Sequence, residues 1–259
     1  MSKKILLGRR ELVIGLAAGT IFPLAGCADN AALGRNQLML VSQAEIERLS
    51  ATAWRDTIQR ERVLTDPAYT SRLERVGTRM ADTSGLSHLD WEFVVIDSDL
   101  VNAWVLPNGK VAFYKGLMDL VETDGHIATI MGHEMGHVAG RHAAERASQQ
   151  RAAQMGMQLV GMALNSQGVD YDADMAAALG AGIQYGVILP YSREHEFEAD
   201  RLGIDYMVGA GYAARDAMDV WLAMSTLHQD RALEFTSTHP SDDARIAAMR
   251  AHIDAMGYI

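Results

Sequence analysis

The segment His133-Glu-Met-Gly-His137 constrains this chain more than any other part of its sequence. In an α-helix, residues four apart lie on one face, so His133 and His137 point two imidazoles at one place. Neutral imidazoles are common zinc ligands, and the neighbouring Glu134 can remove a proton from a water molecule on the metal. The segment therefore predicts a helical site that could hydrolyse a peptide bond, provided that the chain supplies a third ligand. The alternative is a surface helix with two exposed histidines.

The surrounding sequence predicts one helix over residues 125–148. Asp124 is a suitable N-cap, the range contains no proline, and apolar residues recur at helical spacing. Gly132 and Gly136 each lower the helix propensity by about 1 kcal/mol relative to alanine. Their presence in an otherwise favourable helix suggests that it packs closely against another backbone.

An acidic segment further along the chain, residues 192–200, can supply the third ligand. The only cysteine, Cys27, lies too far upstream to do so. If a helix begins with Ser192 as its N-cap, Glu196 and Asp200 share one face. Glu196 can then reach the metal, while Asp200 can accept a hydrogen bond from a ligand histidine. The alternative is a solvated acidic helix face. Two further acidic residues fall on other faces: Glu194 and Glu198.

Together these segments resemble the HtpX/BepA/LoiP family of zinc metallopeptidases, which includes the CAAX prenyl proteases and the Oma-type mitochondrial proteases. The likeness is closest to the LoiP-like lipoproteins and covers roughly residues 65–250. It implies a mainly helical α+β fold of the zincin type, with a small sheet or hairpin beside the zinc helix. Three more segments carry the resemblance: 102–114, Gly140-Arg-His142, and Thr238-His-Pro240 with Arg245 beyond it.

The resemblance also implies roles for individual residues. One Zn²⁺ per chain is held by His133, His137 and Glu196, with Glu134 as the general base. His239 lies near the metal, either as a donor to the oxyanion or as a fourth ligand that keeps the enzyme latent. Supporting positions around the metal are Asp200, His142 and Arg245. An extended substrate is expected to pair with an exposed strand edge at Asn102, Ala103 and Trp104.

The first 26 residues are typical of a secretory signal, with four basic residues before a short apolar stretch. The ending Leu24-Ala-Gly-Cys27 resembles a bacterial lipobox, which implies cleavage before Cys27 and acylation of that residue. Ala28 follows in place of the aspartate of an inner-membrane retention signal, which favours the outer membrane, facing the periplasm. Arg9-Arg10 resembles a twin-arginine export signal in part. We therefore expect a signal peptide at 1–26, a lipid-proximal tether at 27–41 and a single metallopeptidase domain at 42–259.

The net charge of −10 becomes −13 once the signal, which carries +3, is removed. Such acidity argues against nucleic acid as a partner. Residues 151–164 and 175–189 are apolar but too short to span a membrane. The patterns of the mature chain predict helices at 42–62, 67–82 and 116–122, a strand at 91–96 and a hairpin from 101–106 and 110–114.

These features predict a zinc endopeptidase of the envelope of a Gram-negative bacterium, acting on misfolded or misassembled envelope proteins. The alternative is a latent, zinc-stapled chaperone or assembly factor for outer-membrane proteins, working with the envelope assembly machinery. The intact Glu134 favours the enzyme, because a protein that only binds its clients does not need a general base.

Overall fold

The computed structural model describes residues 26–168, 176–177, 180, 189–230, 234–239 and 243–258. Apart from Gly26, the predicted signal peptide lies outside these ranges, as does most of the predicted segment 175–189. The chain divides into two compact units, where the sequence suggested one domain after residue 42. One unit comprises residues 1–42 and 144–192, and the other comprises 43–143 and 193–259.

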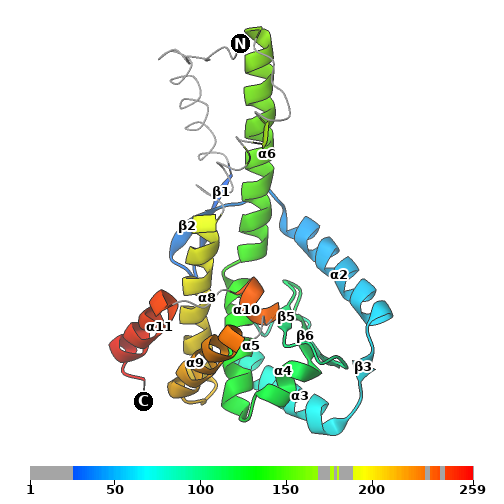
Figure 1. Ribbon diagram of the computed structural model, residues 1–259, viewed down its shortest axis with the longest axis vertical. Coiled ribbons are helices and arrows are strands. Elements are labelled where there is room, and N and C mark those ends of the chain that lie inside the picture. Colours follow the sequence, from blue (N-terminus) through cyan, green and yellow to red (C-terminus); the bar gives the residue numbers. More distant parts are fainter. Residues whose placement is uncertain are drawn as a thin grey trace. The chain divides into compact units, whose positions relative to one another are not determined.

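The first unit combines a hairpin with a long helix (Figure 1). Strands β1 (Cys27–Asn30) and β2 (Arg35–Leu38) pair antiparallel beside α6 (His142–Ser166). The predicted tether at 27–41 therefore contains a hairpin. A buried carboxylate fixes it, because Glu145 accepts hydrogen bonds from Arg35 and Gln37 at 2.7–2.9 Å. Glu145 lies about a hundred residues away in the sequence, so no local pattern predicts this pairing.

The second unit contains a four-stranded sheet in the order β3-β4-β6-β5. The predicted hairpin is present, since β5 (Ala103–Val105) pairs antiparallel with β6 (Lys110–Tyr114). Gly109 closes its turn with a φ of 84°, which glycine adopts without strain. The other two strands are β3 (Val63–Leu64) and β4 (Glu92–Ile96), and β4 runs parallel to β6. This order leaves β5 at one edge of the sheet.

The two helices that precede most of the sheet in the chain begin and end close to their predicted positions. The helices described in the second unit are α2 (Gln43–Arg60), α3 (Pro67–Thr83), α4 (Lys115–Leu120), α5 (Asp124–Ala139), α8 (Leu189–Gly209), α9 (Ala214–Asp230), α10 (Glu234–Thr238) and α11 (Asp243–Met256). Asp66 caps α3 by accepting a hydrogen bond from the backbone of Ala68. Among the residues that the structure describes, no helix has both the length and the apolar character needed to cross a membrane.

Three helix boundaries differ from the prediction. Thr123, not Asp124, caps α5, and its hydroxyl accepts a hydrogen bond from the His126 amide. The expected helix over 125–148 ends at Ala139, because Arg141 takes a φ of 51° and starts a new direction for α6. Ser192 lies inside α8, which begins at Leu189.

Helix α5, which carries His133 and His137, is almost completely buried in the core of the second unit. The prediction of close backbone packing is confirmed, since Gly132 faces Gly203 of α8 and Gly136 faces Ala199. A Cβ atom on Gly132 would lie only 2.6 Å from the Gly203 carbonyl oxygen, and one on Gly136 would lie 2.6 Å from that of Ala199. The glycines therefore let α5 and α8 touch along their backbones, which determines how the site is built.

Candidate metal centre

The two touching helices bring the three predicted ligands together. His133 and His137 come from α5, and Glu196 comes from α8. The Nε2 atoms of the two histidines are 3.2 Å apart. The Glu196 carboxylate oxygens lie 3.3 Å from Nε2 of His133 and 3.4 Å from Nε2 of His137. All three side chains are largely buried, so their donor atoms face one another and not the solvent.

This arrangement fits a tetrahedral metal ion. For metal–ligand bonds of about 2.0–2.1 Å, neighbouring ligand atoms of a tetrahedron are roughly 3.3 Å apart. The three separations of 3.2–3.4 Å match that edge length. Two imidazoles with one carboxylate are also a donor set that zinc accepts in hydrolases. The residues present therefore fit one zinc ion without rearrangement.

His239, at the end of α10, completes the group. Its Nδ1 lies 3.1 Å from Nε2 of His133 and 3.2 Å from a Glu196 oxygen. The four residues offer donor atoms that all lie within 4.8 Å of one another. The backbone holds His239 in place, since its amide donates to the Phe235 carbonyl and its carbonyl accepts from Arg245. His239 thus lies where both roles implied by the resemblance would require it.

Asp200 and Arg245 form a buried support behind His133. Asp200 lies one turn beyond Glu196, and its oxygen is 2.8 Å from Nδ1 of His133. With Nε2 directed at the metal position, Nδ1 carries the proton and donates it to Asp200. Arg245 binds Asp200 through two hydrogen bonds of 2.7 and 2.8 Å and also contacts Glu196 at 3.1 Å. The guanidinium lies 4.3 Å from the ring centre of Trp221.

The electrostatics follow from this burial and pairing. Burial alone would raise the pKa of Asp200, but Arg245 and His133 hold it below its ordinary value. Burial similarly opposes ionisation of Glu196, yet the surrounding histidines keep its pKa well below normal. Burial would lower the pKa of His133, but Asp200 and Glu196 raise it to about 9. By contrast, burial lowers the pKa of His137, so that side chain is neutral at physiological pH.

A second support lies behind His137. Its Nδ1 is 2.8 Å from Nδ1 of His142, and Nε2 of His142 is 3.1 Å from the Glu198 carboxylate. Glu198 thus favours one arrangement of protons on His142 and His137, in which Nε2 of His137 is left without a proton and can bind a metal. The family resemblance implies a place for His142 near the site, whereas helical spacing puts Glu198 on another face than Glu196, and the structure pairs it with His142.

The cluster of His142, His195 and Glu198 has metal-binding residue types, but its geometry favours hydrogen bonding. The rings of His142 and His195 are stacked with centroids 4.2 Å apart and only 7° between their planes. An ion binds close to the plane of each imidazole that ligates it, so two parallel rings cannot share one ion without rotating. In the site of His133 and His137 the rings are nearly perpendicular, at 85°.

Glu134 is buried beside the donor group. Among the described residues, none donates a hydrogen bond to its Oε1, which lies 3.3 Å from Nε2 of His239. Burial raises the pKa of Glu134, although the nearby histidines and a backbone hydrogen bond from Val105 counteract it. A carboxylate with a raised pKa is better suited to accept and return a proton near neutral pH.

The predicted substrate edge lies next to this base. Strand β5 is the outermost strand of its sheet, and its Val105 amide reaches Glu134. The Ala103 side chain is buried in the core, whereas the Trp104 ring packs edge-on against Trp54 of α2, with centroids 6.0 Å apart. Asn102 is tied to β6 through its carbonyl. The backbone of β5, more than its side chains, is therefore what an extended substrate could pair with.

Aromatic residues around the site are not predictable from the sequence. Trp221 of α9 contacts His133 edge-on at 5.2 Å between centroids, and Phe235 of α10 lies 4.9 Å from the His239 ring. The Phe235 amide also donates to the Val101 carbonyl, which joins α10 to the segment before β5. Aromatic residues at helical spacing are usually core residues, so their sequence positions carried no signal of a site.

Comparison with known proteins agrees with this geometry. Residues 67–253 match the family described as Peptidase family M48. The chain is 32% identical over 207 residues to "Mitochondrial metalloendopeptidase OMA1" of Schizosaccharomyces pombe, covering 77% of this chain and 58% of that protein. It is 29% identical over 236 residues to "Metalloendopeptidase OMA1, mitochondrial" of Homo sapiens, covering 87% and 44%.

A bacterial relative is also similar. The chain is 27% identical over 206 residues to the "Beta-barrel assembly-enhancing protease" of Escherichia coli, covering 75% of this chain and 41% of that protein. The chain thus spans between about two fifths and three fifths of the length of these three curated relatives.

Proposed function

This chain belongs to peptidase family M48, and from that premise we propose that it is a zinc-dependent endopeptidase. The observation that carries the proposal is the buried, raised-pKa Glu134 beside a His133–His137–Glu196 donor set of tetrahedral dimensions. Zinc in that set would polarise a peptide carbonyl and lower the pKa of water. Glu134 removes a proton from the attacking water and passes it to the leaving amine.

Unfolded or misassembled envelope proteins are the proposed substrates. Strand β5 lies at the edge of its sheet, where its backbone could pair with an extended chain, and a protein that has failed to fold offers such a chain. The printed name of the Escherichia coli relative refers to β-barrel assembly, which supports a role near the envelope assembly machinery. The lipobox that ends at Cys27 supports lipid attachment, and Ala28 after it supports the outer membrane, with the site in the periplasm.

The position of His239 supports a resting state of low activity. Its Nδ1 lies among the candidate metal donors and its Nε2 lies beside Glu134, so one ring covers both the position that a metal would take and the base. An incoming substrate must displace that ring before water and a carbonyl can reach the site. The same observation favours the second candidate function, a latent chaperone that holds its clients without cutting them.

Cleavage of casein by the purified protein separates the two functions. We expect hydrolysis that stops when a chelator removes the metal and returns with added zinc. His239→Ala is expected to cut faster than the wild type, because the ring no longer covers the site. If both proteins bind an unfolded porin and neither cleaves it at any zinc concentration, the chaperone is the correct reading. Slower cleavage by His239→Ala would instead make His239 a donor to the oxyanion. The mass of the N-terminal peptide tests acylation of Cys27 separately.

A further inference from the structure

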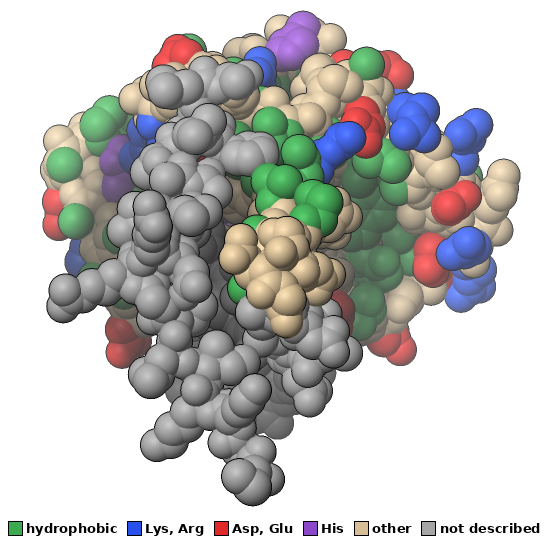
Figure 2. All heavy atoms as spheres, turned by 90° about the horizontal axis from the view of Figure 1, so that it is seen from above, with side chains coloured by type: hydrophobic (Ala, Val, Ile, Leu, Met, Phe, Trp, Pro, Cys, Tyr) green, Lys and Arg blue, Asp and Glu red, His purple; other side chains and the backbone are tan. Residues whose placement is uncertain are grey.

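An apolar stripe runs along the C-terminal half of α6, which we call its distal half, within the first unit. Met155, Leu159 and Met162 lie on one face of the helix, at spacings of four and three residues, and they are 41%, 45% and 61% exposed. From Ala152 to Gly168 no residue carries a charge. Figure 2, which looks down on the upper end of α6, shows hydrophobic side chains gathered at the centre of the view. Such a stripe on a helix without charges calls for an apolar environment.

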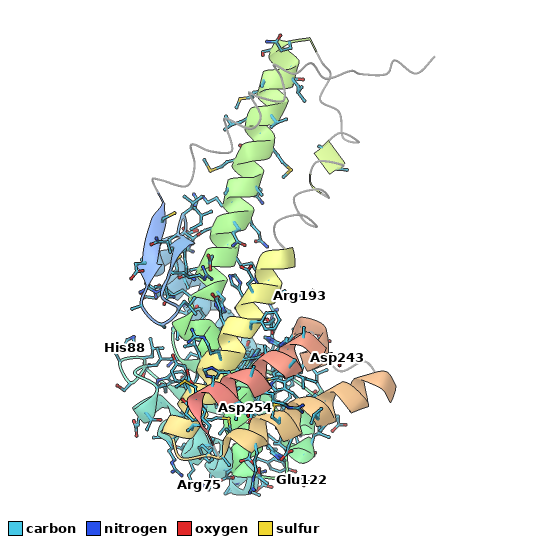
Figure 3. The ribbon with its side chains drawn as sticks, turned by 90° about the vertical axis from the view of Figure 1, so that its left-hand side faces the viewer. Arg75, His88, Glu122, Arg193, Asp243 and Asp254 are labelled. Carbon is cyan, nitrogen blue, oxygen red and sulfur yellow. The ribbon has the colours of Figure 1, made fainter. Side chains whose placement is uncertain are left out.

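The hairpin places Cys27 toward the same end of α6. Along β2 and the residues after it, the contacts with α6 advance from Glu145, which binds Arg35, to Ser148, which accepts from the amides of Leu40 and Val41. Cys27 pairs with Leu38 at the open end of the hairpin, so it lies on the Ser148 side. Figures 1 and 3 show this open end facing the same way as the distal end of α6.

The remaining length of α6 suits a surface contact. The helix continues from Ser148 to Ser166, about 27 Å at 1.5 Å per residue. It is not apolar enough to cross a membrane. Beside the stripe, exposed Gln154 and Gln158 supply uncharged polar groups that can hydrogen bond to lipid head groups. A helix with an apolar stripe between uncharged polar side chains can lie along a membrane surface with the stripe toward the acyl chains.

We propose that the stripe of Met155, Leu159 and Met162 rests in the membrane surface beside the acylated Cys27, so that α6 is a second membrane contact of the protein. The inference rests on the proposed lipid anchor. The anchor holds the stripe at high local concentration next to lipid, so a modest apolar area is enough to keep it there. The second contact would fix the orientation of the first unit on the membrane, which a flexible acyl anchor alone does not do.

Site-specific quenching tests the contact. Because acylation consumes the only native cysteine, a cysteine placed at 155, 159 or 162 can be labelled selectively with the fluorophore NBD. The matched control is Gln154→Cys, which is exposed on the same helix but off the stripe. The full-length chain is produced in a Gram-negative host and reconstituted into phosphatidylethanolamine–phosphatidylglycerol vesicles with or without brominated acyl chains.

We expect brominated lipid to quench the three stripe positions about twofold or more, and position 154 much less, because bromine quenches only probes at acyl-chain depth. Equal, weak quenching at all four positions in acylated protein overturns the membrane contact and leaves the anchor intact. Apolar emission without quenching at the stripe means that protein covers it, which also overturns the proposal. A non-acylated Cys27 in the mass spectrum removes the anchor, and the inference fails with it, whether or not the protein cleaves casein.

Discussion

Replacing Gly203 with alanine tests whether backbone contact between α5 and α8 sets the metal site. An alanine Cβ there would lie 2.7 Å from the Gly132 carbonyl carbon and from the His133 amide nitrogen. Both atoms belong to the backbone and cannot rotate away. Reaching ordinary van der Waals contact at 3.4 Å requires the helices to separate by about 0.7 Å. The separation acts directly between the helix carrying His133 and the helix carrying Glu196.

The expected magnitudes follow from this displacement. Overpacking costs about 1–3 kcal/mol, and the higher helix propensity of alanine offsets about 1 kcal/mol, so we expect a net loss of up to about 2 kcal/mol. Metal–ligand distances tolerate only about 0.2 Å, so the zinc affinity should fall by roughly 10- to 100-fold. Gly209→Ala is the matched control on α8, because its Cβ would meet nothing within 4 Å. It should leave zinc affinity unchanged and the protein as stable or slightly more stable.

Competition with a chromophoric chelator gives the zinc affinity of both variants, and urea unfolding in the presence of a chelator gives their metal-free stability. The expected pattern is a loss of affinity in Gly203→Ala alone. If Gly203→Ala binds zinc as tightly as Gly209→Ala, backbone contact between the two helices does not position the ligands.

Three further predictions concern the groups behind the ligands. Arg245→Met should lower the free energy of unfolding by about 3–5 kcal/mol, because it leaves the Asp200 carboxylate buried without its bidentate partner. Urea unfolding measures this loss, and a value below about 1 kcal/mol would contradict the prediction. Glu198→Gln should weaken zinc binding by about tenfold or more through His142 while the fold stays intact, and an unchanged chelator titration would remove Glu198 from the support. In the metal-free protein His133 has its pKa raised from 6.5 to about 9, so zinc must displace a proton below that pH. Zinc affinity should therefore rise as the pH increases from about 6.5 to 9, more steeply than in Asp200→Asn, and parallel slopes for the two proteins would refute the assignment.

The helix and sheet pattern of the second unit was accessible from the sequence because local signals there agree with the tertiary structure. Asp66-Pro67 marks the start of α3, and the turn at Asn108-Gly109 marks the β5–β6 hairpin. Gly132 and Gly136 were informative for another reason, since an unfavourable residue in a buried helix indicates close packing.

Features that depend on distant partners were not accessible. The hairpin at 27–38 contains no apolar alternation, and its order comes from Glu145, which no local rule connects to Arg35. The break after α5 depends on Arg141, whose positive φ is not typical of arginine. A Cβ at the preceding Gly140 would lie 2.3 Å from the His142 ring, so this turn is shaped by a support residue of the site.

The site divides in the same way. Helical spacing alone pairs His133 with His137 and Glu196 with Asp200, so half of the arrangement follows from periodicity. Helix packing determines the rest: the contact between the two pairs, the two hydrogen bonds from Arg245 to Asp200, and the position of the Trp221 ring over the guanidinium. A single sequence contains no information on that packing unless a family resemblance supplies it.

The most direct test of the proposed mechanism compares zinc content and casein cleavage in Glu134→Gln and Glu196→Ala. Glu134 does not hold the metal, so Glu134→Gln should keep one zinc per chain and lose at least about 10³-fold in kcat/KM. Glu196→Ala removes a ligand and should lose both zinc and cleavage. Cleavage by Glu134→Gln at the wild-type rate, or full zinc retention by Glu196→Ala, would contradict the assignment of base and ligand.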